Sequence, residues 1–242
     1  MLTVYVDMMS QPARALLIFI RLNKLPVKEV VINLARGRNR QDEYLEIYKL
    51  GKIPCLKEGD WVLPESATIL RYLARTFSDK IAAHWYPEES KARAKVEAAM
   101  DWHHSNTRQG CMLLIWNQVI APANGQPYSE SLIKRATFVL EQSLQALERY
   151  WLADTTFVAG DDISIADLLI CTELVMLRML DGAQDEVRDM EAWLKPYPKV
   201  RTWMFGVHDS TEPYWSEVHA IMHAAARKLK ERKFHETSLS KL

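Results

Sequence analysis

The sequence is poor in cysteine and has no excess of either charge, and both absences argue against particular classes of protein. Only three of its 242 residues are cysteines, Cys55, Cys111 and Cys171, and no two of them form a C-x-x-C pair. An odd number of widely spaced cysteines argues against a disulfide framework and a zinc site, so we expect a reducing compartment. Lys and Arg together number 31, as do Asp and Glu. This balance argues against a nucleic-acid partner and against electrostatic membrane binding.

Long apolar runs are also absent. No segment approaches the ~20 consecutive apolar residues of a membrane-spanning helix. The chain opens directly on a strand pattern, so we expect no signal peptide. Hydrophobic residues nevertheless make up 48% of the sequence, which is enough for a sizeable core. The length suits two modest domains or one large one.

Residues 1–78 alternate between strand and helix patterns. Strands are predicted in LTVYVD, in VKEVVINL and in IPCLKEGDWVLP, the last being a hairpin that turns at residues 58–60. Helices are predicted in ARALLIFIRLN and ESATILRYLARTF, with some helical character in ARGRNRQDEYLEIYKLG. The order βαβαββα predicts a small α/β domain, followed by a linker over residues 79–88.

Residues 89–242 carry helical patterns and predict an all-α domain. One amphipathic run over residues 89–120 predicts a single long helix, and APANGQPYS interrupts the pattern after it. The segment ISIADLLICTELVMLRML predicts a buried helix, because its apolar residues nearly encircle it.

The end of the first strand raises the first question of function. Ser10 stands where this strand ends and the first helix begins, and Pro12 lies early in that helix. Ser10 is either a simple N-cap, which is worth about 1 kcal/mol, or a hydroxyl that helps a helix N-terminus hold an anion. The residue pattern alone leaves both interpretations open.

Two further segments also have a structural and a functional interpretation. Ile53 precedes Pro54 and must be extended, so this segment either starts a strand or leaves the Ile53 backbone free to pair with an extended peptide ligand. Ser66 is predicted as a helix N-cap. Together with Glu65 it offers a hydroxyl, backbone N–H groups and a carboxylate, which suit a ligand that carries both a carboxylate and an ammonium group.

Two other polar patterns point to structure and not to chemistry. Ser164 and Asp167 have the spacing of a capping box and predict a helix start. His103 and His104 are adjacent, so they point to different faces of a helix. Neither of them has a second histidine four residues away, so we expect no metal bound at this pair.

Taken together, the segments SQPARAL, KIP, PES, DWHHSNTR and ISIADL, in this order and spacing, resemble the glutathione transferases and, within them, the theta class. The resemblance runs over nearly the whole chain. It implies a thioredoxin-like N-terminal domain, a helical C-terminal domain, a homodimer, and glutathione as the co-substrate. It also implies that Ser10 hydrogen-bonds the sulfur of glutathione and stabilises its thiolate.

The resemblance carries the rest of the glutathione site over, residue by residue. Pro54 would be the family's cis proline, and Asp101 of the partner subunit would reach towards the γ-glutamyl headgroup. Contacts with glutathione itself are implied for Lys52, the Ile53 backbone, Glu65 and Ser66. Two departures affect this expectation. Asn39 and Arg40 stand where theta proteins often have His or Gln beside the glycyl carboxylate, and Tyr48-Lys49 replaces the usual Asn-Pro.

An apolar electrophile would bind in the cleft between the domains, with Arg108 near the sulfur. Candidate cleft residues are Met8, Met9, Met112, Ile115 and Trp116, and ordinary core packing is the alternative for each of them. The implied activities are conjugation of glutathione to apolar electrophiles and reduction of organic hydroperoxides. The rival is a non-catalytic ligand-binding or interaction protein on the same fold, because fold does not fix function.

The last three residues are Ser240, Lys241 and Leu242. This tripeptide matches a peroxisomal address at a free carboxyl terminus, so we expect recognition by the peroxisomal import receptor, with a cytoplasmic pool as the other location. A chance match is the alternative.

Overall fold

The computed structural model describes residues 1–182 and 189–239, the last eight of these by their backbone alone. The tripeptide Ser240-Lys241-Leu242 lies outside the described residues. Among the described residues, no helix combines the length and the apolar character that a membrane crossing requires.

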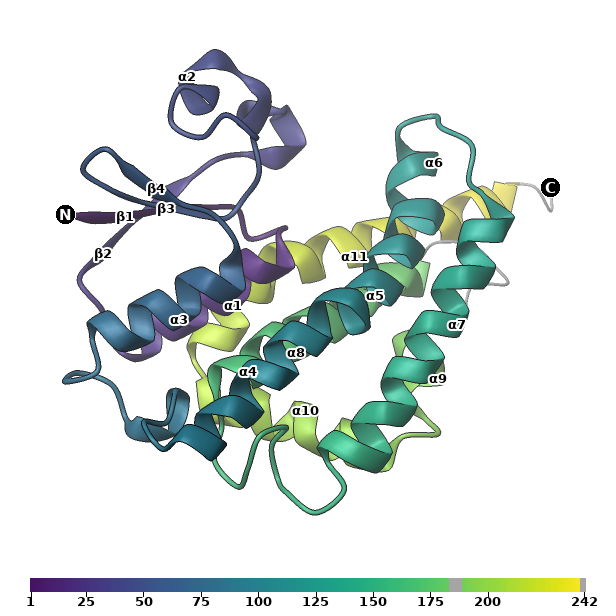
Figure 1. Cartoon of the computed structure of the whole chain (residues 1–242). Coiled ribbons are helices and arrows are strands. Elements are labelled where there is room, and N and C mark those ends of the chain that lie inside the picture. Colours follow the sequence, from purple (N-terminus) through teal and green to yellow (C-terminus); the bar gives the residue numbers. More distant parts are fainter. Residues whose placement is uncertain (183–188, 240–242) are drawn as a thin grey trace.

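The N-terminal domain is a four-stranded mixed sheet with helices. Its strands are β1 (Leu2–Val6), β2 (Val27–Val31), β3 (Cys55–Glu58) and β4 (Trp61–Leu63), in the spatial order β2-β1-β3-β4. Strand β1 runs parallel to β2 and antiparallel to β3, and β3 pairs antiparallel with β4. The helices are α1 (Gln11–Leu22), α2 (Asp42–Leu45) and α3 (Ser66–Thr76). The predicted order βαβαββα is confirmed (Figure 1).

The pairing of β1 with β3 determines where the functional segments meet. Tyr5, near the end of β1, lies opposite Cys55, the first residue of β3. The turn that follows β1 and the loop that precedes β3 therefore reach the same edge of the sheet. Residues 11–20 of α1 are all buried, because this helix packs against α3 of its own domain and against α8 and α11 of the helical domain.

The second domain is entirely helical in its described part. Between the domains, residues 79–88 include a 3-10 turn at Ala83–Trp85. The helices are α4 (Ser90–Ser105), α5 (Thr107–Ile115), α6 (Ala121–Ala123), α7 (Glu130–Ala146), α8 (Ile165–Val175), α9 (Met190–Leu194), α10 (Pro198–Thr211) and α11 (Tyr214–Leu239). Short irregular helical segments continue α5, α7 and α8 at Trp116–Ile120, Leu147–Trp151 and Met176–Gly182.

The prediction of a single helix over residues 89–120 is wrong. Asn106 separates α4 from α5 with φ −115° and ψ −96°. Its side-chain amide donates to the carbonyl of Trp102 at 2.8 Å. Asparagine side chains compete in this way for backbone groups and favour helix ends. The expected burial of the ISIADL helix is confirmed, since every residue of α8 is buried.

Candidate functional site

The turn between β1 and α1 is held by Asp7. One carboxylate oxygen of Asp7 accepts from the backbone N–H of Met9 at 2.7 Å, and the other accepts from that of Leu34 at 2.7 Å. The Asp7 carbonyl accepts from the backbone N–H of Ser10 at 2.9 Å. Because Leu34 follows β2, these bonds fix the turn to the neighbouring loop and give Ser10 one defined position.

Arg14 fastens the same turn to the helical domain. Its side chain is fully buried and donates to the carbonyl of Met8 at 2.8 Å and to that of Thr172, in α8, at 3.2 Å. Burial lowers the pKa of Arg14 to about 10, against the opposing effect of Glu173 and Asp7, so it remains a cation at neutral pH. Sequence reasoning missed this residue, although an arginine inside the apolar run ARALLIFI is a visible signal.

Ser10 is the N-cap residue of α1, but its side chain makes no capping hydrogen bond. The first turn of α1 contains no acidic residue, so nothing within that turn neutralises the positive end of the helix dipole. The side chain of Gln11 donates to the sulfur of Met112, in α5, at 2.7 Å. The structure thus brings Met112 to the start of α1, beside Ser10, which is buried and whose side chain makes no capping hydrogen bond.

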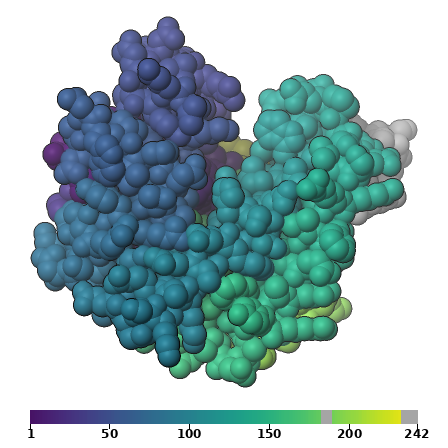
Figure 2. All heavy atoms as spheres, in the orientation of Figure 1, coloured from purple at the N-terminus to yellow at the C-terminus, as the bar shows by residue number. Residues whose placement is uncertain are grey.

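The start of α1 lies at a hollow between the domains. Figure 2 shows this hollow between the purple and blue N-terminal domain and the teal part of the helical domain that contains α5 and α6. Met8 and Met9 are half-buried against the core, and Trp116 is 47% exposed. Ile115 is completely buried, so its expected place in a cleft wall is wrong: it faces the core of the helical domain.

The loop before β3 is shaped by Asn39 and Tyr44. Gly51 has φ +60°, and a Cβ added there would lie 2.7 Å from the carbonyl oxygen of Asn39. The Asn39 amide donates to the Gly51 carbonyl at 2.8 Å, and the Tyr44 hydroxyl donates to the Lys52 carbonyl at 2.7 Å. Asn39 therefore supports the loop, whereas Arg40 is exposed. Tyr44 is a further residue that sequence reasoning missed.

This loop presents the KIP segment at the sheet edge. Lys52 is exposed, Ile53 is half-buried, and the Ile53–Pro54 peptide bond is cis, as the resemblance implies. Burial and the nearby Glu65 carboxylate raise the pKa of Tyr48. Tyr48, one of the two departures, therefore lies within electrostatic range of Glu65 at the start of α3.

The start of α3 differs by one residue from the prediction. Glu65 occupies the N-cap position with φ 67°, and its carbonyl accepts the first helical hydrogen bond, from Ile69, at 2.8 Å. Ser66 is already the first helical residue, so the prediction of Ser66 as the N-cap is wrong. Both residues nevertheless stand at this helix start, Glu65 exposed and Ser66 half-buried.

Asp101 and Arg108, the candidates from the helical domain, both have partners within this chain. Asp101 forms an ion pair with Arg71 of α3 at 2.5 Å. Arg108 hydrogen-bonds the buried carboxylate of Glu173, to which His103 also lies close, at 3.7 Å. Burial alone raises the pKa of Glu173, but Arg108 and His103 outweigh it and hold that pKa below its usual value. Arg108 thus neutralises a buried carboxylate in α8.

Comparison with known proteins assigns both halves of the chain to one protein family. Residues 4–81 match the family "Glutathione S-transferase, N-terminal domain", and residues 111–208 match "Glutathione S-transferase, C-terminal domain". Glutathione S-transferase T1 of Arabidopsis thaliana is 38% identical over 223 residues, which cover 91% of this chain and 89% of that protein. This chain belongs to the theta class of the glutathione S-transferases.

Other relatives and solved structures agree with this assignment. Glutathione S-transferase T2 of Arabidopsis thaliana is 36% identical over 96% of this chain, which spans only 39% of the length of that protein. Human glutathione transferase theta-2, solved in complex with glutathione, superposes with a TM-score of 0.85 at 30% identity and covers 96% of this chain and 91% of its own. The apo form of human glutathione-S-transferase T1-1 superposes with a TM-score of 0.82 at 31% identity, and the match covers 99% of each chain.

Proposed function

We propose that this theta-class chain is an active glutathione transferase that adds the glutathione thiolate to apolar electrophiles. Glutathione would lie along the KIP loop, with its γ-glutamyl end at Glu65 and Ser66 and its sulfur at Ser10. The observation that carries the proposal is the Ser10 hydroxyl, which caps α1 by position but makes no capping hydrogen bond.

The expected effect of Ser10 on the thiol is large enough for catalysis. A free thiol titrates near pH ~8.5, and each unit by which its pKa falls corresponds to about 1.4 kcal/mol. A hydrogen bond to a charged group contributes about 1.5–3 kcal/mol, and a helix N-terminus adds about 0.3–1 kcal/mol. Together these would lower the thiol pKa by about one to three units, so that thiolate becomes substantial at neutral pH.

The second substrate would enter the hollow that Figure 2 shows, beside Met112 and Trp116. With an electrophile, the sulfur forms a bond to carbon and the leaving group departs. With an organic hydroperoxide, the thiolate attacks the terminal oxygen and the O–O bond breaks, giving an alcohol and glutathione sulfenate. A second glutathione then reduces the sulfenate to the disulfide and water.

The rival is a non-catalytic ligand-binding or interaction protein on the same fold. It would need neither an N-cap hydroxyl that makes no capping bond nor a first helical turn without acidic residues, and both are present in α1. The discriminating experiment measures thiol conjugation to an activated alkyl or aryl halide, and reduction of cumene hydroperoxide, with the full chain. Turnover that depends on Ser10 supports the enzyme, whereas glutathione binding without turnover of either substrate supports the rival.

Two further expectations extend this proposal. A homodimer would place Asp101 of the partner subunit near the headgroup of glutathione. Import into peroxisomes through Ser240-Lys241-Leu242 would bring the enzyme to a source of hydroperoxides. An N-terminal fluorescent fusion, compared with the same fusion lacking residues 240–242, tests import. A diffuse signal from both fusions would contradict it and leave the enzymatic proposal intact.

A further inference from the structure

The KIP loop is held by two side chains that precede it in the sequence. The side-chain amide of Asn39 donates to the carbonyl of Gly51 at 2.8 Å, and the hydroxyl of Tyr44 donates to the carbonyl of Lys52 at 2.7 Å. Two consecutive carbonyls of the chain therefore have fixed directions. The bond from Tyr44 lies next to Ile53, whose backbone is a proposed contact of glutathione.

Tyr44 connects a short outlying helix to the sheet. It is the one buried residue of α2, and Figure 1 shows α2 on the side of the sheet away from α1 and α3. The Tyr44 ring packs edge-on against that of Tyr5 in β1, with the ring centroids 5.8 Å apart. The Tyr44 oxygen lies 3.2 Å from the sulfur of Cys55, the first residue of β3. Two strands thus hold the phenol in place.

The Tyr44 hydroxyl is a donor at neutral pH. Burial, followed by the contact with Cys55, raises the pKa of Tyr44 above its ordinary value, so the phenol keeps its proton. Burial also raises the pKa of the Cys55 thiol, against the opposing effect of its contact with Tyr44. An uncharged thiol is a weak acceptor, so it does not compete with the Lys52 carbonyl for the phenol proton.

The bond from Tyr44 also fixes the direction of the next N–H group. The Lys52 carbonyl and the Ile53 N–H belong to one planar, trans peptide unit, in which the two groups point in opposite directions. Because the carbonyl points at the buried phenol, the N–H points away from it. Neither the N–H nor the carbonyl of Ile53 forms a hydrogen bond with another residue of the ranges 1–182 and 189–239. Both groups are therefore available to a ligand.

We propose that Tyr44 is a positioning residue for glutathione, whose hydroxyl holds the Lys52–Ile53 peptide so that the Ile53 N–H can pair with the backbone of the tripeptide. This inference rests on the proposed function, which lays glutathione along the KIP loop. Tyr44 acts through the Lys52 carbonyl and does not itself touch glutathione. It therefore sets affinity, whereas thiolate formation is assigned to Ser10. The alternative is a purely structural tyrosine that holds α2 against the sheet.

The test is Y44F, which keeps the ring and its packing against Tyr5 but removes the hydroxyl. In calorimetric titration of the full chain with glutathione, the dissociation constant should rise about three- to tenfold, the ratio that corresponds to one lost hydrogen bond. KM for glutathione should rise by a similar factor. The value of kcat at saturating glutathione and the thiol pKa of bound glutathione should not change, because Ser10 is untouched.

The matched control is Y5F. Tyr5 belongs to the same aromatic pair, but its hydroxyl forms no hydrogen bond with another described residue. Its loss should change the dissociation constant less than about twofold. Equal dissociation constants in Y44F and Y5F would overturn the proposal. So would a fall in stability or in kcat of Y44F at wild-type affinity, because a purely structural tyrosine predicts that result.

Hydrogen exchange tests the Ile53 N–H directly. Bound glutathione should slow exchange of this amide in the wild type, and should slow it less in Y44F at equal occupancy of the site. Equal protection in the two proteins would overturn the positioning role. A wild type that does not bind glutathione would overturn the proposed function and this inference together. A wild type that binds it, with Y44F behaving as Y5F does, would overturn this inference alone.

Discussion

Ser10 and Ser164 occupy the N-cap positions of α1 and α8, and the two serines have different environments. At the start of α8, the Ser164 hydroxyl donates to Asp167 at 2.7 Å, and the same carboxylate oxygen accepts the Ser164 backbone N–H at 2.8 Å. The other oxygen of Asp167 accepts from Val158 at 2.9 Å and from the Trp203 indole at 2.8 Å. At the start of α1, Ser10 has none of this: its side chain makes no capping bond and no acidic residue follows in the first turn.

The difference separates a helix start that stabilises the fold from one that is available to a ligand. Free donors at a helix N-terminus must be satisfied by side chains, by water or by a ligand. At α8 the chain itself supplies the acceptor, deep in the core. At α1 the chain supplies none from the first turn, while Asp7 and Arg14 hold the backbone around Ser10 in place. The predictions below test each half of this comparison.

The largest effect is expected for Asp167→Ala. The substitution removes four hydrogen bonds and leaves the N–H groups of Val158 and Trp203 buried without an acceptor. Each such group costs about 1–3 kcal/mol, so the free energy of unfolding should fall by about 3–5 kcal/mol. Urea unfolding followed by circular dichroism measures this loss. Asp161→Ala, at an exposed position nearby, is the control, and a loss below about 1 kcal/mol in Asp167→Ala would contradict the structural role.

The next largest effect is expected for Ser10→Ala. This substitution should change the thiol pKa of bound glutathione and the activity, and leave the free energy of unfolding unchanged. The pKa of glutathione bound to the variant should rise by about one to two units, the equivalent of a lost hydrogen bond of about 1.5–3 kcal/mol. Activity should fall about 10- to 100-fold at neutral pH. The loss should shrink as the pH rises through the raised thiol pKa, because the thiol then ionises without help. Thiolate absorbance of the complex, recorded against pH, measures this shift.

The control for Ser10→Ala is Ser164→Ala. It should lower the free energy of unfolding by about 1 kcal/mol, as expected for a lost N-cap, and leave the thiol pKa of bound glutathione unchanged. An unchanged thiol pKa in Ser10→Ala, or equal effects of the two variants, would show that the two helix starts do not differ as the structure suggests.

The sequence predicts those features that depend on neighbours along the chain. The capping box of α8 has its two members three residues apart, and the order of strands and helices follows from periodicity. The start of α3 shows how local this power is. Serine is a favoured N-cap residue, so the sequence predicts the cap at Ser66. In the structure the N-cap is Glu65, whose φ is positive. A positive φ is uncommon for residues other than glycine, so the sequence did not indicate it.

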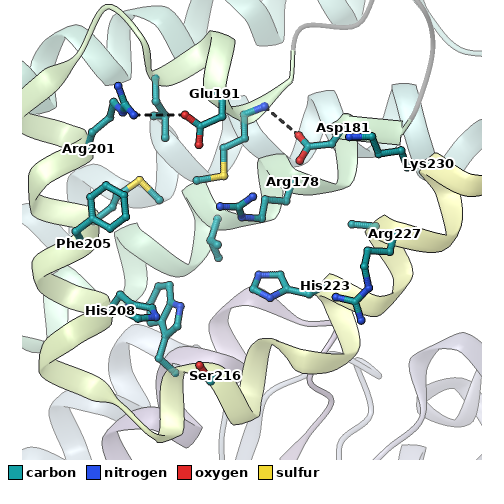
Figure 3. A pocket seen from close by; sticks show the side chains of 16 residues that line it. Arg178, Asp181, Glu191, Arg201, Phe205, His208, Ser216, His223, Arg227 and Lys230 are labelled. Carbon is teal, nitrogen blue, oxygen red and sulfur yellow. Dashed lines mark hydrogen bonds and ion pairs between the residues drawn. The ribbon is translucent and has the colours of Figure 1, made fainter.

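Contacts between segments that are distant in the sequence leave no short-range pattern from which they could be predicted. Arg14 bonds Thr172, which is 158 residues away in the sequence, and Gln11 bonds Met112, which is 101 residues away. The pairing of Arg108 with Glu173 likewise joins α5 to α8. A cavity that Figure 3 shows is assembled from five segments of the helical domain, namely α8, Met176–Gly182, α9, α10 and α11, and no short motif in any one of them points to it.

A smaller effect is expected for Arg14→Met, which removes the bond from Arg14 to the Met8 carbonyl. Leaving that carbonyl and the Thr172 carbonyl without this donor should lower the free energy of unfolding by about 1–2 kcal/mol. As a positioning residue, Arg14 should also affect Ser10: kcat should fall several-fold, while KM for glutathione changes less. The thiol pKa of bound glutathione distinguishes this role from a purely structural one. A stability loss with no change in that pKa or in kcat would contradict positioning.

The smallest effect on stability is expected for Asp101→Ala. Its side chain is 72% exposed, and exposed ion pairs contribute about 0–1 kcal/mol, so unfolding of the protomer should change by less than about 1 kcal/mol. If the chain is a homodimer with Asp101 beside the partner's glutathione, KM for glutathione should still rise several-fold. Asp79→Ala, at an exposed position at the end of the N-terminal domain, is the matched control and should leave KM unchanged. Sedimentation velocity at micromolar concentration completes the test, because a fully active monomer would contradict both the dimer and the shared site.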